Sequence, residues 1–254
     1  MKIIVHLLAL AGALAGALAA HAQGYPARPV RVIVPYAAGG NTDIVMRAIA
    51  AKVGPAFGQQ IVVDNRPGGG TNIGSELVAK APPDGYLLLM GGAANAINMS
   101  LFAHPPYQTL RDIVPVVLCT TGANVLSAHP AVPAKNLKQL VALAKARPGQ
   151  LNFASSGIGS SNQMAGELLK MMAGINIVHV PYKGNAPALV DAVAGHVELI
   201  FSGVTAPIPH FRSGRLRARA IGSLERFPAI ADVPTFDESG VEGYEAITWV
   251  GLRA

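Results

Sequence analysis

The chain offers little from which a metal centre or a disulfide could be built. Its 254 residues include a single cysteine, Cys119, so no internal disulfide and no thiolate metal cluster can form. Cys119 follows the apolar residues 116–118, and we expect it to be buried in the core. The histidines are isolated from one another, without the paired spacing of a zinc site. We therefore expect no metal and no cofactor.

Catalytic and nucleotide-binding motifs are absent as well. No Gly-x-Ser-x-Gly elbow occurs, and no glycine-rich loop carries the lysine of a P-loop. Gly157 and Gly159 are followed by Asn162 at the position where a dinucleotide fingerprint needs its third glycine. Since an enzyme needs a positioned acid, base or nucleophile, we expect no catalytic residues and no enzyme activity. Turnover of a bound ligand would restore the alternative of a periplasmic enzyme.

Charge is also scarce. Charged residues make up 13% of the chain, with a formal net charge of +6 and a pI near 9.6. The basic residues are scattered, and the densest group, which alternates as a strand with a solvated face would, consists of Arg212, Arg215, Arg217 and Arg219. This distribution predicts no nucleic-acid partner and leaves only a general attraction for anions.

Long apolar runs are missing except at the N-terminus. Residues 7–20 form a run of Leu, Ala and Gly after Lys2, and Ala20-His21-Ala22 has the small-x-small pattern of a cleavage site. The run is about 14 residues long, whereas a membrane-spanning helix needs roughly 20. We therefore predict a signal peptide over 1–22, cleavage after Ala22 and export to the periplasm. An uncleaved membrane anchor is the alternative.

The rest of the chain alternates short β-branched runs with amphipathic helical patterns. Such alternation is typical of an α/β fold with largely parallel strands. Strands are expected near 30–34, 61–63, 86–90, 151–154, 175–180, 197–201 and 216–221. Helices are expected near 43–53, 71–80, 137–144 and 188–194, with a further helix after Ser161 whose buried side carries Met164, Leu168, Met171 and Met172.

Three glycine-rich loops stand where an expected strand gives way to an expected helix. They cover residues 37–42, 155–161 and 182–185. In this arrangement backbone N–H groups at the helix start are unpaired, and the positive end of the helix dipole lies behind them, which suits an anion with several oxygens. Ordinary turns and helix caps would explain each loop equally well. Asp43 either complements the helix dipole or holds the first loop in shape for a ligand.

A series of short segments spans essentially the whole mature chain: 34–43, 64–74, 82–86, 156–160, 166–168, 180–184, and 232–235 with 238–240. Examples are Val34-Pro35-Tyr36-Ala37-Ala38-Gly39-Gly40 and Val180-Pro181-Tyr182-Lys183-Gly184. In sequence, order and spacing these segments resemble the substrate-binding proteins of tripartite tricarboxylate transporters.

The resemblance implies a type II periplasmic binding protein with two α/β lobes around a ligand cleft, joined by crossing strands. Lobe one would comprise 24–123 plus 231–254, and lobe two 124–230. The first two loops would form the two sides of a carboxylate cradle, with Tyr182 and Lys183 at its edge. The ligand-binding residues would be Tyr36, Ala38, Gly39, Gly40, Asn41, Thr42, Asp43, Ser155, Ser156, Gly157, Gly159, Ser160, Ser161, Tyr182 and Lys183.

The resemblance also implies a role in uptake. A monomeric protein would capture a di- or tricarboxylate, an acidic amino acid or an aromatic acid and deliver it to membrane permease subunits. A ligand sensor that presents its bound form to a membrane signalling partner is the alternative. The chain departs from the family pattern at Asn41, where Gly or Ser is frequent, and at Ser202, where an acidic residue is frequent. It also stops at Ala254, so the C-terminal part of lobe one is expected to be missing.

Overall fold

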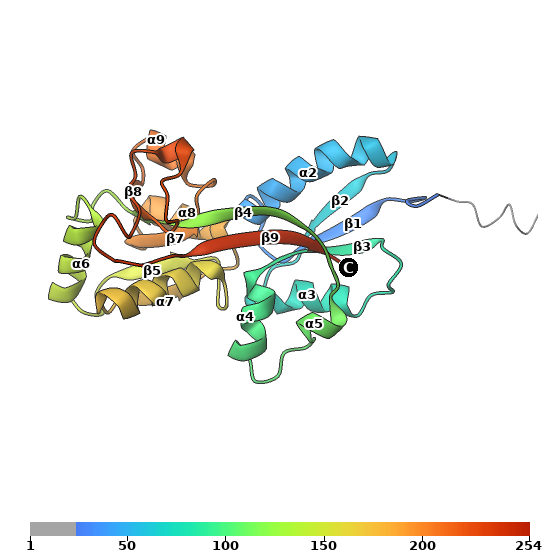
Figure 1. The fold of residues 1–254 in the computed structure, drawn as a ribbon, viewed down its shortest axis with the longest axis horizontal. Coiled ribbons are helices and arrows are strands. Elements are labelled where there is room, and N and C mark those ends of the chain that lie inside the picture. The colour runs from blue at the N-terminus through green and yellow to red at the C-terminus, as the bar shows by residue number, and fades with distance from the viewer. Residues whose placement is uncertain (1–23) are drawn as a thin grey trace, which may run out of the picture.

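The computed structural model describes residues 24–254. The predicted signal peptide and its cleavage site lie outside these described residues. The molecule is elongated and consists of two α/β halves that lie end to end, as Figure 1 shows. Its strands follow the order β2-β1-β3-β9-β4-β7-β5-β6, and β8 also pairs with β4.

The first half is built on three parallel strands with β1 in the centre. The sequence of β1, Val-Arg-Val-Ile-Val, supplies β-branched side chains that are buried except at Arg31. The strands are β1 (Val30–Val34), β2 (Ile61–Asn65) and β3 (Leu87–Gly92). The helices are α2 (Asn41–Phe57), α3 (Asn72–Ala79), α4 (Ala93–Leu101) and α5 (Thr109–Asp112), with a 3₁₀ turn η1 (Gly69–Thr71) before α3.

The second half repeats this design. Strand β5 pairs in parallel with β6 and β7. The strands are β5 (Asn152–Ser155), β6 (Val178–Pro181), β7 (Leu199–Gly203) and β8 (Arg217–Ile221). The helices are α6 (Leu137–Ala146), α7 (Ser161–Ala173), α8 (Asn185–Ala194) and α9 (Ile208–Arg212), and the 3₁₀ turn η2 (Pro228–Ile230) follows β8.

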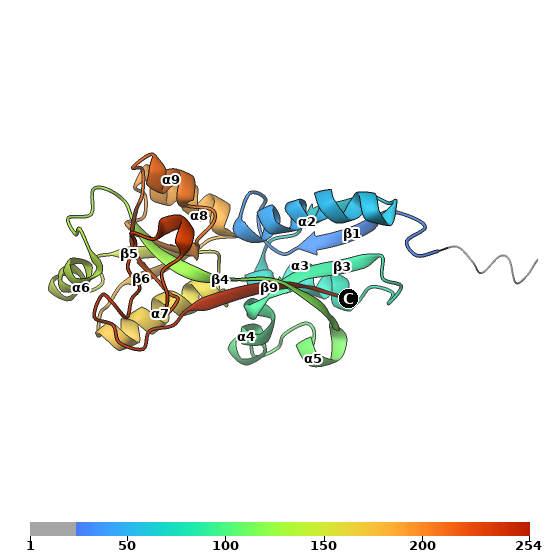
Figure 2. The ribbon, with the colours of Figure 1, turned by 45° about the horizontal axis from the view of Figure 1, so that its top comes forward.

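Two long strands join the halves. Strand β4 (Pro115–Ala128) and strand β9 (Ile247–Arg253) run antiparallel and are hydrogen-bonded to each other. Strand β9 also pairs with β3 of the first half, while the later part of β4 pairs with β7 and β8 of the second. Both strands pass side by side from one half to the other in Figures 1 and 2. The halves are therefore connected by a two-stranded ribbon.

The core of the second half contains a column of aromatic rings. Phe201 and Phe236 lie parallel with their ring centroids 6.3 Å apart, and Tyr244 stacks on Phe236 at 3.9 Å. The Tyr244 hydroxyl donates a hydrogen bond to the carbonyl of Ala165 on α7. Residues 236–246, which the sequence assigned to the first lobe, thus pack in the same core as Phe153. This packing shows only where that segment lies, and the lobe boundaries themselves stay a prediction.

The predicted buried face of α7 is wrong at its C-terminal end. Leu168 packs against the core and Met164 is half-buried, but Met171 and Met172 are exposed, whereas Ala165 and Leu169 are buried. The reason is Gly166, whose missing side chain leaves room for the ring of Phe153. Close packing against this ring turns the side of α7 that contains Gly166 toward the sheet and rotates Met171 and Met172 toward solvent.

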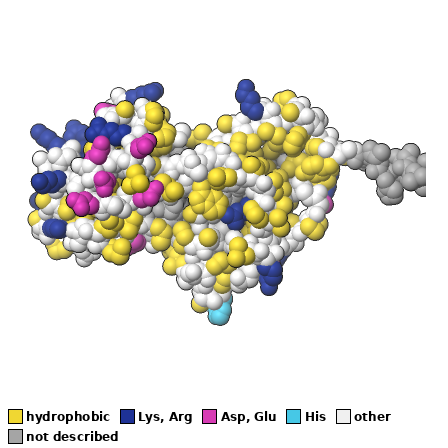
Figure 3. All heavy atoms as spheres, in the orientation of Figure 1, with side chains coloured by type: hydrophobic (Ala, Val, Ile, Leu, Met, Phe, Trp, Pro, Cys, Tyr) yellow, Lys and Arg dark blue, Asp and Glu magenta, His cyan; other side chains and the backbone are white. Residues whose placement is uncertain are grey.

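Two further expectations from composition are corrected. Cys119 is only partly buried and packs against the core of the first half, while the side chains of 116–118 before it are exposed. Arg219 is not on a solvated face but is 4% exposed, and it donates to the carbonyl of Lys135. Burial lowers its pKa, and the neighbouring charge of Arg217 acts in the same direction. On the face drawn in Figure 3, charged side chains gather over the second half.

Candidate functional site

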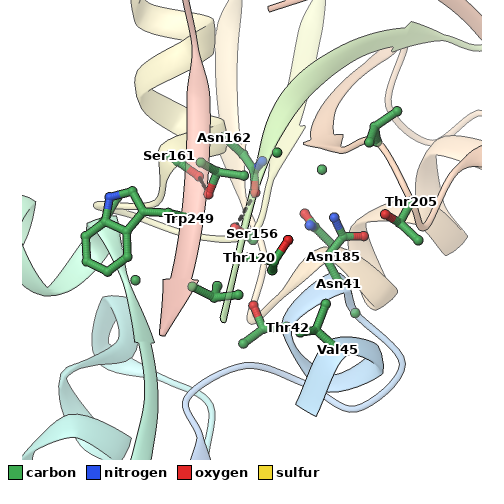
Figure 4. A pocket seen from close by; sticks show the side chains of 18 of the residues that line it. Asn41, Thr42, Val45, Thr120, Ser156, Ser161, Asn162, Asn185, Thr205 and Trp249 are labelled. Carbon is green, nitrogen blue, oxygen red and sulfur yellow. Dashed lines mark hydrogen bonds between the residues drawn. The ribbon is translucent and has the colours of Figure 1, made fainter. Parts of the chain in front are cut away.

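A cavity of about 170 Å³ lies between the two halves, beside the crossing strands. Figure 4 shows polar side chains from both halves around it. The first half contributes Tyr36, Gly40, Asn41, Thr42, Val45, Gly92, Ala93 and Ala94. The crossing strands contribute Thr120, Thr121, Gly122, Ala123, Thr248, Trp249 and Val250, and the second half contributes Ser156, Ser161, Asn162, Asn185, Gly203, Val204, Thr205 and Phe227.

Four helices begin at this cavity. Lining residues lie at the N-terminal ends of α2, α4, α7 and α8, two helices from each half. Each helix start carries a partial positive charge of about half a unit and N–H groups without an intrahelical partner. None of the lining residues is acidic or basic. The helix ends thus contribute positive partial charge to the cavity without any cationic side chain, which favours a bound anion.

The first loop is held from behind by Asp43. Its carboxylate accepts the N–H of Gly39 at 2.9 Å, the Nε of Arg47 at 2.9 Å and the amide of Asn65 at 3.0 Å. Burial alone would raise the pKa of Asp43, but these hydrogen bonds and the charge of Arg47 outweigh it and lower the pKa. Asp43 is 2% exposed and does not line the cavity. The second of its two suggested roles, shaping the loop, is the one that this geometry supports.

The hydroxyl groups of the second loop are engaged with the protein. Ser156 donates to Asn162 Oδ1 at 2.5 Å, Ser160 to the carbonyl of Gly157 at 2.6 Å, and Ser161 to Thr248 Oγ1 at 3.0 Å. Since a hydroxyl carries one hydrogen, Ser156 and Ser160 have none left to donate to an anion. In the bond between Ser161 and Thr248 either hydroxyl can donate, so one hydrogen of that pair and the N–H groups at the start of α7 remain.

The hydrogen bond of Ser156 is the first link in a buried chain. Asn162 donates to Asn124 Oδ1 at 2.5 Å, and Asn124 donates to the carbonyl of Ala246 at 3.1 Å. A carbonyl oxygen can only accept, so it fixes the direction of every bond in this chain. Asn124 lies in β4 and Ala246 directly precedes β9. The chain thus connects the second loop to both crossing strands.

The third loop faces two different spaces. Asn185, the first residue of α8, lines the cavity between the halves. Tyr182 and Lys183 line a separate hollow together with Gly157. The Tyr182 hydroxyl donates to Asp191 at 2.6 Å, and burial together with this carboxylate raises the pKa of Tyr182 to about 12. The hydroxyl hydrogen of Tyr182 is therefore used in a bond to α8.

The predicted site residues fall into three groups. The cavity is lined by Tyr36, Gly40, Asn41, Thr42, Ser156 and Ser161. The separate hollow is lined by Gly157, Tyr182 and Lys183, and also by Tyr36 and Ser156. The remaining predicted residues line neither space and lie within or beside the two loops: Ala38, Gly39, Asp43, Ser155, Gly159 and Ser160. A direct role of these residues in ligand binding stays a prediction.

Sequence reasoning missed the remaining walls of the cavity. Gly92 and the start of α4 repeat the pattern of strand, glycine and helix, so that signal was available in the sequence. The parts from β4, β7 and β9 carry no such signal, because they depend on the order of strands in the sheet. Within 24–254 no three His, Cys, Asp or Glu side chains are grouped as metal ligands. No helix in that same range has the length and apolarity needed to cross a membrane.

Comparison with known sequences gives consistent matches. The model of the family described as "Tripartite tricarboxylate transporter family receptor" matches residues 45–254. The chain is 40% identical over 248 residues to a protein encoded in the tcbD-tcbE intergenic region of Pseudomonas sp. strain P51, covering 97% of this chain and 74% of that protein. It is 39% identical over 235 residues to protein BugT of Bordetella pertussis, covering 92% of this chain and 72% of BugT.

Solved structures match with similar strength. The periplasmic binding protein BugD is 37% identical with a TM-score of 0.87, covering 91% of this chain and 77% of BugD. Rpa4515 of R. palustris, solved with adipate, is 36% identical with a TM-score of 0.88, covering 91% and 78% of the two chains. MatC from Rhodopseudomonas palustris, solved with bound malate, is 34% identical with a TM-score of 0.86, covering 91% and 79%.

Proposed function

The chain belongs to the tripartite tricarboxylate transporter receptor family, whose members are periplasmic substrate-binding proteins and not enzymes, and we propose that it captures a small carboxylate between its two halves and delivers it to membrane permease subunits. Export would follow from the signal peptide predicted over 1–22. The protein would act as a monomer, as is sufficient for a cleft contained within one chain.

The observation that carries this proposal is the convergence of four helix N-termini on a cavity without charged side chains. Unpaired N–H groups together with helix dipoles favour an anion and accept any carboxylate geometry that reaches them. The side chains around them, which are mostly Asn, Ser and Thr with Trp249 and Phe227, then decide between carboxylates. Adipate and malate in two similar structures are ligands of this chemical class.

Backbone groups of the first and second loops would hold the ligand carboxylate. Asn41, Thr42, Ser161 and Asn162 are placed for this at the starts of α2 and α7, and they line the cavity. Asp43 and Ser160 would act indirectly, by fixing the conformation of the two loops. Tyr182 and Lys183 would lie at the edge of the cleft.

The two halves would be the two lobes of the binding protein. The first lobe would comprise 24–123 with the strand from 247 onward, and the second 124–246, because 236–246 packs in the second core. Opening would turn the halves about β4 and β9 and expose the cavity to solvent. Closing would remove the ligand from water, which strengthens its electrostatic interactions with the N–H groups.

A thermal-shift screen tests capture. The panel is malate, adipate, citrate, aspartate and benzoate, which represent the candidate classes. At least one acid should raise the unfolding temperature, since a ligand present at 100 times its Kd adds about 2.7 kcal/mol to stability. The methyl ester of that acid, which lacks the charge, should give no shift. Absence of any shift and of any calorimetric binding across the panel would contradict the proposal.

Delivery needs a separate measurement. Uptake of the identified acid, carrying a radioactive label, should require both this protein and the permease subunits in the same cells. A transcriptional response to the acid that persists after the permease is deleted, with uptake unchanged in cells lacking this protein, would instead indicate a sensor.

A further inference from the structure

The side chain of Asn41 spans the space between the two halves. Asn41 is the first residue of α2 and belongs to the first half. Its Oδ1 accepts a hydrogen bond of 3.0 Å from the backbone N–H of Ala206, in the turn between β7 and α9 of the second half. Figure 4 shows Asn41 beside Asn185 and Thr205. Asn41 thus contributes to the cavity wall and also bonds the halves to each other.

The other end of the Asn41 amide lies against Gly203. A Cβ on Gly203 would overlap Asn41 Nδ2, so the amide occupies the space that any side chain at this position would fill. Gly203 does not have a positive φ, and its backbone conformation is open to any residue. The glycine is therefore required for the approach of Asn41 and not for the backbone of β7.

Other glycines make close contacts between the halves, but they differ in one respect. A Cβ on Gly184 would lie 2.9 Å from the backbone N of Ala37, and one on Gly70 would lie 2.7 Å from the carbonyl oxygen of Ile158. Both have φ in the left-handed region, at 142° and 63°, so glycine is favoured there for a second reason. A substitution at Gly203 therefore tests closure alone. A substitution at Gly184 or Gly70 would also strain the backbone.

We infer that Asn41 and Gly203 form a clasp that holds the two halves closed. Asn41 is then a positioning residue for the closed state, in addition to any contact with the ligand. The clasp lowers the free energy of the closed form relative to an open form in which the Ala206 N–H and the Asn41 amide are both hydrated. Its ligand-binding consequence rests on the proposed function, whereas its effect on the shape of the ligand-free protein does not.

Paired substitutions test the clasp. Gly203→Ala places a methyl group in the position of the Asn41 amide and should prevent closure. Asn41→Ala removes the amide and leaves the two Cβ atoms about 3.6 Å apart, which is ordinary contact, so the double variant should close as far as Asn41→Ala alone does. Gly54→Ala, in the same helix as Asn41, is the matched control, since a Cβ there lies no closer than 3.4 Å to its neighbours and the φ is not positive.

The expected binding results follow from the population of the closed state. Gly203→Ala should weaken binding of malate or adipate about tenfold or more, because apparent affinity scales with the fraction of competent protein. Asn41→Ala should weaken it about threefold to tenfold through one lost hydrogen bond. Adding Gly203→Ala to Asn41→Ala should change the Kd by less than about threefold. The free energy of unfolding of each clasp variant should stay within about 1.5 kcal/mol of the wild-type value, since opening relieves the clash and only one hydrogen bond is lost.

Small-angle scattering without ligand separates this inference from the proposed function. Gly203→Ala should have a larger radius of gyration than the wild type. The double variant should have a smaller radius than Gly203→Ala, equal to that of Asn41→Ala. Should no carboxylate bind the wild type, the proposed function fails and the scattering alone decides the clasp. The clasp would be refuted if all proteins had equal radii of gyration. It would also be refuted if the loss of affinity in the double variant equalled the product of the losses in the two single variants.

Discussion

The carboxylate of Asp43 accepts the backbone N–H of Gly39, four residues before it, at 2.9 Å. This bond ties the first loop to the first turn of the helix that follows it. Gly39 has φ at 80°, a conformation that favours glycine. The bond to Arg47 at 2.9 Å and the bond from Asn65 at 3.0 Å orient the same carboxylate. The buried charge of Asp43 is thereby balanced by Arg47, and its carboxylate does not line the cavity.

Replacing Asp43 with Asn should loosen this loop. The substitution keeps the shape but removes the charge and places an amide NH₂ against a donor, so unfolding should become easier by about 1–3 kcal/mol. Ligand affinity should fall as well. Urea denaturation and calorimetry measure the two effects. Glu76→Gln, which removes an exposed pair with Lys80 on α3, should cost no more than about 0.5 kcal/mol. Equal losses for the two variants would contradict the role of Asp43.

Protonation of His179 should reduce stability. Its Nε2 lies 2.6 Å from Ser155 Oγ, and burial lowers the pKa of His179, with Glu167 raising it and Lys170 lowering it less strongly. Because the folded pKa lies below the unfolded value near 6.5, the unfolded state binds more protons between the two values. The stabilisation is complete above about pH 6.5 and is lost as the pH falls toward the folded pKa. His179→Gln should make this dependence shallower in urea titrations from pH 7.5 to 5.5, and a slope as steep as that of the wild type would refute the assignment. Some slope remains, because burial also lowers the pKa of His210.

Ser156→Ala should affect both stability and binding. The substitution leaves Asn162 Oδ1 buried without its hydrogen-bond donor, which lowers the free energy of unfolding by about 1–3 kcal/mol. It also removes the first bond in the series of hydrogen bonds that leads through Asn162 to Asn124. Ser161→Ala is the comparison, because its partner Thr248 has a hydroxyl hydrogen of its own and a partly exposed position. The loss in unfolding free energy should be larger for Ser156. A variant with normal stability and lost affinity would instead make Ser156 a direct ligand donor.

The close contact of Gly159 with the first half should matter more for ligand affinity than the lysine at the cleft edge. Gly159 has φ at 76°, and a side chain there would overlap Asn98 of the first half, so Gly159→Val should reduce affinity more than tenfold. Lys183 is exposed, and Lys183→Met should cost about 1 kcal/mol or less. Calorimetry with the acid found in the screen measures both. The reverse order would mean that a side-chain ion pair holds the ligand.

Elements with strong local signals were predicted well from the sequence. The strand at 30–34 is found at those residues, and the helix expected over 43–53 runs from Asn41 to Phe57. Gly54 and Pro55 are poor helix formers, and the predicted helix therefore ended before them. The helix continues through both residues because tertiary packing outweighs their low helix propensity. The exposed faces of α7 and β4 were not predictable, because they depend on which neighbour covers each side.

The site was predictable in its loops and not in its walls. Glycine-rich turns after strands mark helix starts, and three of the four helix starts at the cavity were found in this way. That Asn162 donates to Asn124 as well as lining the cavity could not be predicted, since the two are 38 positions apart along the chain. The same holds for Asn41 and Gly203, whose proximity arises only when the two halves meet.

The ribbon of β4 and β9 limits how the molecule can move. Two hydrogen-bonded strands flex easily out of their common plane but resist sliding, because sliding would break the ladder between them. Register shifts between Pro115 and Val117 and between Leu118 and Thr120 already bend β4 just before Thr120 reaches the cavity. We therefore expect the two halves to open by bending of this ribbon and not by sliding along it.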